Sequence, residues 1–149
     1  MLIGDICTRE VVQCDRTTSA SDVAQLMRHS HVGDVVVVDQ PNGKKVAIGI
    51  VTDRDLVVQV MAAERDPLTT TAGDIMGPDL VTVGERNTIH ETAELMRLKG
   101  VRRIPVVDED GGLLGIVALD DLLTEIGEEL ALLGKVFARG QVQEERTRG

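Results

Sequence analysis

Aromatic residues are almost absent from this chain of 149 residues, which has one Phe and neither Tyr nor Trp. Proteins that bind single-stranded nucleic acid stack the bases on aromatic side chains, so the composition argues against that class. The core must instead be built from Val, Ile, Leu, Met and Ala. A chain of this length buries roughly 68–70% of its unfolded surface, which is enough for a stable core without disulfides or metals.

Basic charge, cysteine and long apolar runs are also scarce. The 16 basic residues are outnumbered by 25 acidic ones, for a net charge of −9. Because nucleic acids and anionic membranes attract basic surfaces, we expect neither as a partner. Two cysteines, Cys7 and Cys14, do not form the framework of a secreted domain. With no signal peptide and no apolar run of about 18 residues, we expect a soluble cytoplasmic protein.

The chain contains an internal repeat with a period close to 69 residues. Three segments recur at this offset: Gly4-Asp5-Ile6 and Gly73-Asp74-Ile75, Leu26-Met27-Arg28 and Leu95-Met96-Arg97, Val37-Val38-Asp39 and Val106-Val107-Asp108. The offset falls to 66 at Gly49-Ile50-Val51 and Gly115-Ile116-Val117, so the first copy has three additional residues in the preceding turn. A period this long exceeds that of the common solenoids and indicates two similar halves.

Each copy has the pattern of a β-α-β-β-α unit. A short extended piece comes first, at Val11-Val12 and at 80–83, and a helix follows. Continuous β-branched runs, from Val35 to Val38 and from Ile104 to Val107, are typical of strands buried on both faces. Helix starts are marked by the spacing of capping boxes. These are Ser19 with Asp22 and Thr88 with Glu91.

We therefore predict an α/β fold of two repeats related by a pseudo-twofold axis, with an extended C-terminal helix. The expected boundaries are 1–66 for the first repeat, 67–72 for the linker, 73–126 for the second repeat and 127–149 for the helical extension and tail. The extension carries an apolar stripe with a spacing of 3, 4, 3 and 4, typical of a coiled coil. Its residues are Leu123, Ile126, Leu130, Leu133 and Phe137.

Two interpretations of this extension remain open: the helix folds back on its own domain, or it mediates self-association. Gly127 and Gly134 lie inside the helix and weaken it by about 1 kcal/mol each. The tail from Gln141 to Gly149 is charged and lacks apolar periodicity, so we expect it to be frayed.

The stretch from Gly49 to Leu56 joins a buried strand to a helix and places Thr52 and Asp55 at the joint. Thr-x-x-Asp is a capping-box pattern, and a carboxylate and a hydroxyl at a helix start also suit a polar ligand. No nucleophile with a His partner, phosphate-binding loop or metal-ligand spacing is evident. We therefore expect neither an enzyme, a catalytic cofactor nor a bound metal.

With these repeated joints and the segment Val101-Arg102-Arg103-Ile104-Pro105-Val106-Val107-Asp108, the chain resembles the CBS-domain family, as a stand-alone pair also called a Bateman module. The resemblance covers about residues 3 to 126. It implies a regulatory module that binds an adenosine-containing ligand such as AMP, ADP, ATP, NAD or S-adenosylmethionine between the repeats. It also implies a homodimer that signals energy or cofactor status to an unknown effector protein in trans.

The resemblance implies two clefts of unequal quality. The residues expected in the first cleft are Ile50, Thr52, Asp55, Leu80, Val81, Val101, Arg102 and Arg103. There the Asp55 carboxylate would hold a ribose and the arginines a phosphate. The second cleft has Ala118 in place of the threonine, and Gly33 and Asp34 in place of the arginines. Its expected residues are Val11, Val12, Val32, Ile116 and Asp121.

We expect the first cleft to take a phosphorylated adenosine, and the second to be empty or to take a less anionic adenosyl ligand. An alternative function is a ligand-free dimeric interaction protein in which the C-terminal helix is the working part.

Overall fold

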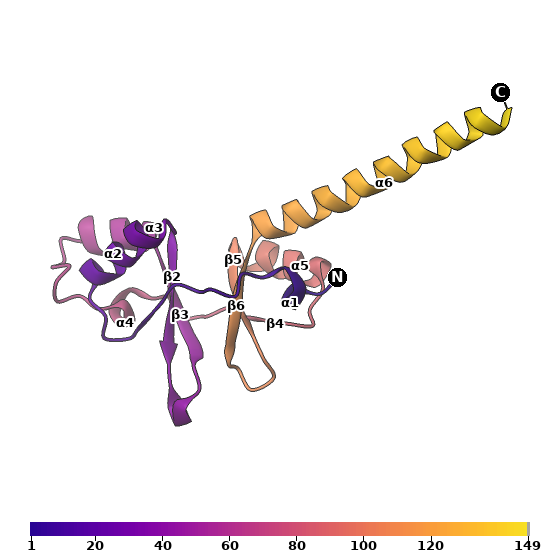
Figure 1. Ribbon diagram of the computed structural model, residues 1–149. Coiled ribbons are helices and arrows are strands. Elements are labelled where there is room, and N and C mark those ends of the chain that lie inside the picture. The colour runs from indigo at the N-terminus through magenta and orange to yellow at the C-terminus, as the bar shows by residue number, and fades with distance from the viewer. Residues whose placement is uncertain (149) are drawn as a thin grey trace.

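The computed structural model describes residues 1–148 of the chain. Two lobes, each built on a three-stranded sheet, lie side by side, and one long helix projects away from them (Figure 1). The predicted architecture of two similar α/β repeats with an extended C-terminal helix is confirmed.

The first lobe consists of the sheet β1-β2-β3, with β1 and β2 parallel and β2 and β3 antiparallel. Helix α2 begins after the Ser19 cap, and the chain after β3 turns directly into α3 and a π-helical segment, η2. The bounds are β1 Gln13–Asp15, α2 Ala20–Ser30, β2 Asp34–Asp39, η1 Pro41–Gly43, β3 Val46–Thr52, α3 Asp53–Asp55 and η2 Leu56–Met61.

The second lobe repeats this topology in the sheet β4-β5-β6. The two sheets share an irregularity, because the register of β2 with β3 shifts between Val37 and Val38, and that of β5 with β6 between Val106 and Val107. These are equivalent positions of the repeats. The bounds are β4 Val83–Gly84, α5 Ile89–Lys99, β5 Arg103–Val107, β6 Leu113–Ala118 and α6 Leu119–Arg148.

The lobes exchange their short N-terminal helices. Helix α1 (Ile3–Ile6) opens the chain but packs on the second lobe, where Ile3 is fully buried in the core of β5 and β6. Helix α4 (Ala72–Ile75) opens the second repeat but packs on the first lobe, where Ile75 is fully buried. Figure 1 shows each of these helices beside the sheet of the other repeat. The chain therefore crosses between the lobes twice.

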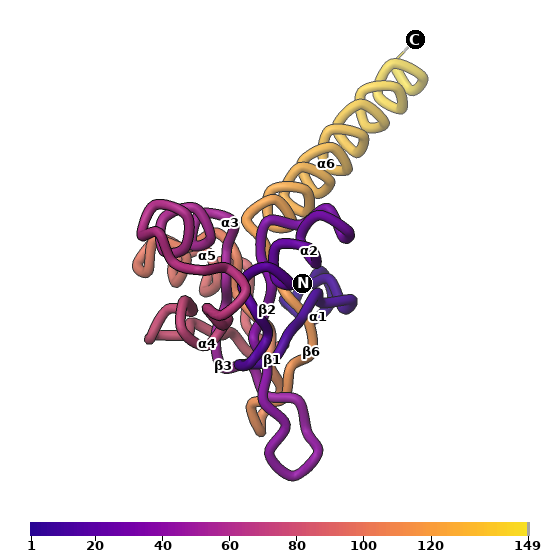
Figure 2. The backbone as a smooth tube through the Cα atoms, turned by 90° about the vertical axis from the view of Figure 1, so that its left-hand side faces the viewer, coloured from indigo at the N-terminus to yellow at the C-terminus, as the bar shows by residue number. Residues whose placement is uncertain are grey.

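The two sheets also share a small core of their own. Val36, Val38 and Ala47 from the first sheet are buried, with Leu113 and Ile116 of the second sheet packed against them. At one end of this interface the turns before β3 and between β5 and β6 meet, because Lys44 Nζ lies 2.9 Å from an Asp108 carboxylate oxygen. The tube in Figure 2, turned by 90° from Figure 1, shows the two hairpin turns at the same end of the molecule.

Helix α6 leaves the lobes soon after it begins. Leu122 is buried in the core of the second lobe, but every residue from Ile126 to Arg148 is exposed. The helix is continuous to Arg148, so the expectation of a frayed tail is wrong for the part of the tail that is described. Among residues 1–148, no helix combines the length and the apolar content that a membrane crossing needs.

Two local expectations need correction. The extended pieces at Val11-Val12 and at Leu80-Val81 precede the strands, because β1 begins at Gln13 and β4 at Val83. The Ser19 hydroxyl accepts a hydrogen bond from the Asp22 amide, but the reciprocal bond of a capping box is formed only in the other repeat, between Thr88 and Glu91.

Candidate functional site

The joint that follows β3 is held by a reciprocal capping box. The Thr52 amide donates to the Asp55 carboxylate over 2.8 Å, and the Asp55 amide donates to the Thr52 hydroxyl over 3.1 Å. Both side chains are therefore used in satisfying the first amides of the helix, which would otherwise lack partners. Gln59 adds a long contact of 3.5 Å to the other oxygen of Asp55.

The equivalent joint after β6 has half of this arrangement. The Ala118 amide donates to the Asp121 carboxylate over 2.8 Å, but Ala118 has no hydroxyl to return a bond. Asp120 and Asp121 both lie in the first turn of α6, where carboxylates are favoured by the helix dipole. The joint thus presents two acidic side chains at the base of the long helix.

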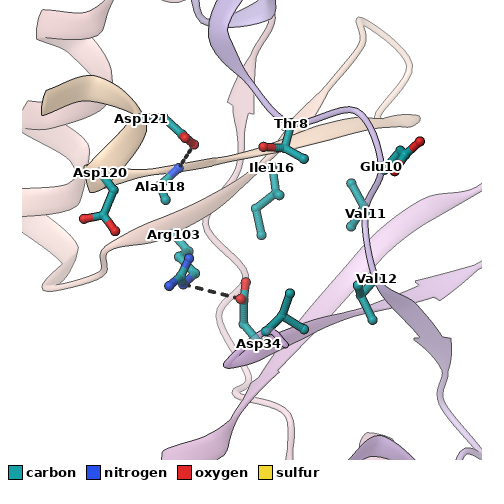
Figure 3. A pocket seen from close by; sticks show the side chains of 11 residues that line it. Thr8, Glu10, Val11, Val12, Asp34, Arg103, Ile116, Ala118, Asp120 and Asp121 are labelled. Atoms are coloured by element: carbon teal, nitrogen blue, oxygen red, sulfur yellow. Dashed lines mark hydrogen bonds and ion pairs between the residues drawn. The ribbon is translucent and has the colours of Figure 1, made fainter. Parts of the chain in front are cut away.

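A cavity of about 210 Å³ lies between the repeats beside this second joint (Figure 3). One wall comes from the crossing segment after α1, and the other from the end of β6 and the start of α6. The structure brings together all five residues expected in the second cleft. The lining residues are Thr8, Glu10, Val11, Val12, Val32, Asp34, Arg103, Ile116, Ala118, Asp120 and Asp121.

The backbone fixes the crossing segment against β6. Thr8 and Ile116 exchange two hydrogen bonds of 2.9 Å each, in the manner of paired strands. This close approach depends on Gly115, because a Cβ atom there would lie 2.6 Å from the Thr8 carbonyl oxygen. Val11 and Val12, which follow Thr8, are consequently held opposite Ile116, and the three side chains form two facing apolar walls (Figure 3).

The first cleft is a much smaller cavity of about 50 Å³. It brings together Ile50, Leu80, Val81, Val101 and Arg103 of the eight expected residues, with Gly77, Asp79 and Pro105 as further lining. Among the described residues, Thr52, Asp55 and Arg102 do not line it. The first cleft, which the sequence analysis equips with more polar residues, therefore has the smaller volume in the structure.

Arg103 lines both cavities and pairs with Asp34. The Arg103 Nε atom lies 3.3 Å from an Asp34 carboxylate oxygen, and Figure 3 shows the two side chains pointing toward one another. Asp34 is only 8% exposed, whereas the Arg103 side chain is 46% exposed. Burial raises the pKa of Asp34, an effect that the Arg103 guanidinium opposes and the nearby Asp53 carboxylate reinforces.

The larger cavity combines apolar walls with an acidic rim. Four carboxylates line it, from Glu10, Asp34, Asp120 and Asp121, and Arg103 is the one basic side chain in the lining. A carboxylate at a helix start accepts hydrogen bonds strongly, and the valine and isoleucine side chains suit a flat apolar group. The excess of acidic groups disfavours a multiply charged anion. The arrangement can therefore hold a neutral or cationic molecule with one flat end and one hydroxyl-bearing end.

Sequence reasoning missed Thr8, Glu10 and Asp120, and it placed Arg103 in one cleft only. A signal for the first two was present: Thr8 and Glu10 precede Val11 as Gly77 and Asp79 precede Leu80, at the repeat offset of 69. Both cysteines are free, with Cys14 buried and Cys7 half-buried. Among residues 1–148, no group of three or more His, Cys, Asp and Glu side chains is placed to hold a metal ion.

Comparison with known proteins gives the family. The sequence model of the CBS domain matches residues 3–62 and again residues 72–128. An uncharacterised protein of Methanopyrus kandleri is 40% identical over 121 residues, which cover 81% of this chain and 60% of that protein. The CBS domain-containing protein YhcV of Bacillus subtilis is 32% identical over 120 residues, which cover 80% of this chain and 81% of that protein.

Two solved structures have the same fold. Hypoxic Response Protein I, with two coordinated zinc ions, is 30% identical and superposes with a TM-score of 0.75, covering 83% of this chain and 98% of that one. A CBS domain protein of Pyrobaculum aerophilum, complexed with AMP, is 25% identical with a TM-score of 0.74, covering 86% and 99% of the two chains.

Proposed function

Because the chain belongs to the CBS-domain family, we propose that it is a regulatory module that binds an adenosine-containing ligand in the cleft between its repeats. The observation that carries the proposal is the cavity of about 210 Å³, where apolar residues of both repeats face each other beside the Asp121 carboxylate. The AMP complex of the Pyrobaculum protein supports the ligand class.

Each part of the ligand has a place in this cleft. The adenine lies between Val11 and Val12 on one side and Ile116 on the other. The ribose hydroxyls donate to Asp121, whose second oxygen adds to the cap of α6. Arg103 lies at the far side and receives the group attached to the ribose. Hydrogen bonds to a charged acceptor contribute about 1.5–3 kcal/mol each, so Asp121 supplies a large share of the affinity.

The charge of the cleft selects among adenosyl ligands. Its acidic groups exceed its basic ones by three, because Glu10, Asp34, Asp120 and Asp121 stand against Arg103. We therefore rank adenosine and S-adenosylmethionine above AMP, and AMP above ATP. The phosphorylated ligand that the sequence assigns to the Thr52 and Asp55 cleft stays a prediction, and it requires that cavity to widen well beyond 50 Å³.

Thermal unfolding in the presence of adenosine, AMP, ADP, ATP, NAD, NADH and S-adenosylmethionine tests the ligand class. A ligand at a hundredfold excess over Kd stabilises the folded protein by about 2.7 kcal/mol, a rise of several degrees in Tm. If every ligand in the panel leaves Tm unchanged at millimolar concentration, the proposal is wrong and an interaction protein without a ligand becomes the better description.

Isothermal titration of two matched variants identifies the cleft. Asp121→Ala and Asp55→Ala remove the same capping contact from equivalent helix starts, but only Asp121 lines the larger cavity. We expect Asp121→Ala to lower affinity about tenfold or more and Asp55→Ala to leave it unchanged, because one hydrogen-bonded charge is worth at least 1.4 kcal/mol. The reverse result would assign the ligand to the first cleft.

The output of the module is carried to a second protein. We propose that occupancy of the cleft is signalled in trans, and that the body of the protein is a homodimer. Exposed apolar side chains on η2 support a protein contact on the first lobe, since Val57, Val58 and Met61 are all about half exposed or more.

A further inference from the structure

Helix α6 is about 45 Å long and carries a long apolar face with no partner in the described chain. The stripe expected from the sequence is open to solvent throughout, with Leu130, Leu133 and Phe137 each more than 60% exposed. Figures 1 and 2 both show the helix extending clear of the lobes. Folding back on the domain, one of the two interpretations of the sequence, is therefore not what the helix does.

Gly127 and Gly134 lie next to this stripe, and no contact within the chain requires a glycine at either position. A Cβ atom built at Gly127 or Gly134 would meet no other atom within 4 Å. Glycine is among the least favourable residues inside a helix, and at an exposed position alanine would be tolerated and more stable. The two glycines are seven residues apart and so share one edge of the stripe, with Ala131 and Ala138 beside them. Small residues on one edge leave room for a second backbone.

Charge is divided between the halves of the helix. From Leu119 to Gly134 there are five acidic residues and no basic one, for a charge of −5. From Lys135 to Arg148 there are four basic and two acidic residues, for a charge of +2. Two such helices side by side repel when parallel, because acidic half lies against acidic half, and attract when antiparallel.

We propose that α6 pairs with α6 of a second copy of this chain in an antiparallel, closely packed coiled coil. In such a pair a residue at heptad position a of one helix packs against a residue at position d of the other. When Leu130 faces Leu133 of the second copy, the same register places Ile126 against Phe137 of the second copy. In the same register Gly127 lies about 3 Å along the axis from the level of Gly134 of the second copy, so the small positions of the two helices lie close together on one edge.

This contact is separate from the clefts and does not depend on ligand binding. We place it between two chains that the lobes do not already join, so it doubles the number of chains in the particle. The apolar stripe, the small edge and the charge division each favour the same occupant, a second copy of the same helix. If the partner were an unrelated helix, the two halves of α6 would not need opposite charges, and its small residues would not need to match those of a second copy.

The first test is the size of the full-length protein by sedimentation. The variant Leu130→Glu/Leu133→Glu places charges in the centre of the stripe, and both positions are exposed, so the lobes fold normally. We expect the number of chains per particle to halve. Leu132→Glu is the matched control, since this leucine is 62% exposed and lies outside the stripe, about 130° around the helix from its centre. Its particles should keep the size of the wild type. Equal sizes for all three proteins would overturn the proposal.

Replacement of the glycines tests the close packing. Leucine is a good helix former, so Gly127→Leu/Gly134→Leu strengthens a solitary helix and broadens its apolar face. In the proposed pair the added side chains force the backbones apart, and we expect the dissociation constant for pairing to rise at least tenfold. The content of helix by circular dichroism should not fall. Pairing that is unchanged or tighter would exclude close packing at this edge.

Cysteine cross-linking tests the orientation. Leu123→Cys in one chain and Gly140→Cys in another fall in the same layer of the antiparallel register, and we expect a disulfide between them when the two variants are mixed. In an antiparallel pair the two copies of residue 123 are about 25 Å apart along the axis. Rapid cross-linking of Leu123→Cys with itself, and none in the mixture, would show a parallel pair and overturn the antiparallel assignment.

Discussion

Asp34 and Arg103 occupy equivalent positions of the two repeats, 69 residues apart, at the starts of β2 and β5, and they form an ion pair of 3.3 Å. A pseudo-twofold axis brings together those equivalent residues that lie close to it, and here their opposite charges form a pair. Arg103 lines both cavities and Asp34 lines the larger one, so this pair contributes to the electrostatics of each. The pair is therefore the natural place to alter ligand selectivity.

Asp34→Asn should shift selectivity toward anionic ligands. The change removes one buried carboxylate from the larger cleft and leaves Arg103 without its partner. Unit charges 4 Å apart near a protein surface interact by about 4 kcal/mol, so about a third of that energy is enough to change a binding affinity tenfold. We expect the affinity for AMP to rise about tenfold relative to that for adenosine, measured by isothermal titration.

Asp39→Asn is the control for this prediction, because Asp39 lies at the other end of β2 and is exposed. An AMP-to-adenosine ratio that responds equally to both variants would show that Asp34 acts only through the net charge of the protein.

The same substitution has a predictable dependence on pH. Since burial raises the pKa of Asp34, the carboxyl binds more protons in the folded state than in the unfolded state. Its contribution to stability is then greatest at low pH and is lost as pH rises above about 4 through the folded pKa. Asparagine is neutral throughout. We expect the Tm of Asp34→Asn, relative to the wild type, to be higher at pH 7 than at pH 4. A difference that grows on acidification would contradict this.

Gly115→Ala should be more damaging than Gly49→Ala, although the two glycines are equivalent. A Cβ atom at Gly115 would meet the Thr8 carbonyl oxygen at 2.6 Å, whereas one at Gly49 would meet the flexible Met76 side chain at 2.5 Å. A backbone cannot move aside as a methionine can. We expect a loss of about 1–3 kcal/mol for Gly115→Ala by urea denaturation and less for Gly49→Ala.

Gly77→Ala serves as the reference for both substitutions, because a Cβ atom there has open space around it. Equal losses for Gly115→Ala and Gly49→Ala would mean that the segment containing Thr8 is as adaptable as a side chain. In that case the wall of the larger cavity would not be rigid.

The exchanged helices predict where a mutation acts. Ile3 is fully buried in the second lobe, so Ile3→Ala should cost about 2–5 kcal/mol. By hydrogen exchange, we expect β5 and β6 to lose protection before β2 and β3, even though Ile3 belongs to the first repeat in sequence. Leu2→Ala, at a position 40% exposed, should change little. Loss of protection confined to β2 and β3 would be incompatible with the exchange.

Duplication in the sequence was enough to predict the fold, and the five residues that the family resemblance implies for the second cleft do line one cavity, although their role in binding stays a prediction. Local patterns could not rank the two clefts. Thr52 and Asp55 look like ligand groups because they are polar and adjacent, yet their hydrogen bonds go to each other's backbone. Cavity volume depends on how side chains of both repeats pack against one another, as at Leu80 and Arg103, and no single segment encodes that.

The exchange of short helices between lobes was not predictable from periodicity, because α1 and α4 have only four residues each. The Asp34 and Arg103 pair, by contrast, could have been found. It follows from aligning the copies and asking which equivalent positions carry opposite charge.

Asp121 is at once a wall of the larger cavity and part of the first turn of α6. From this residue to Arg148 the helix runs about 40 Å without a break. A rigid rod of that length is a lever: a tilt of about 5° at its base moves the far end by about 3–4 Å, which follows from the helix length alone. A small shift of Asp121 in the wall of the cavity would therefore move the C-terminal end of α6 by a distance comparable to the length of a side chain.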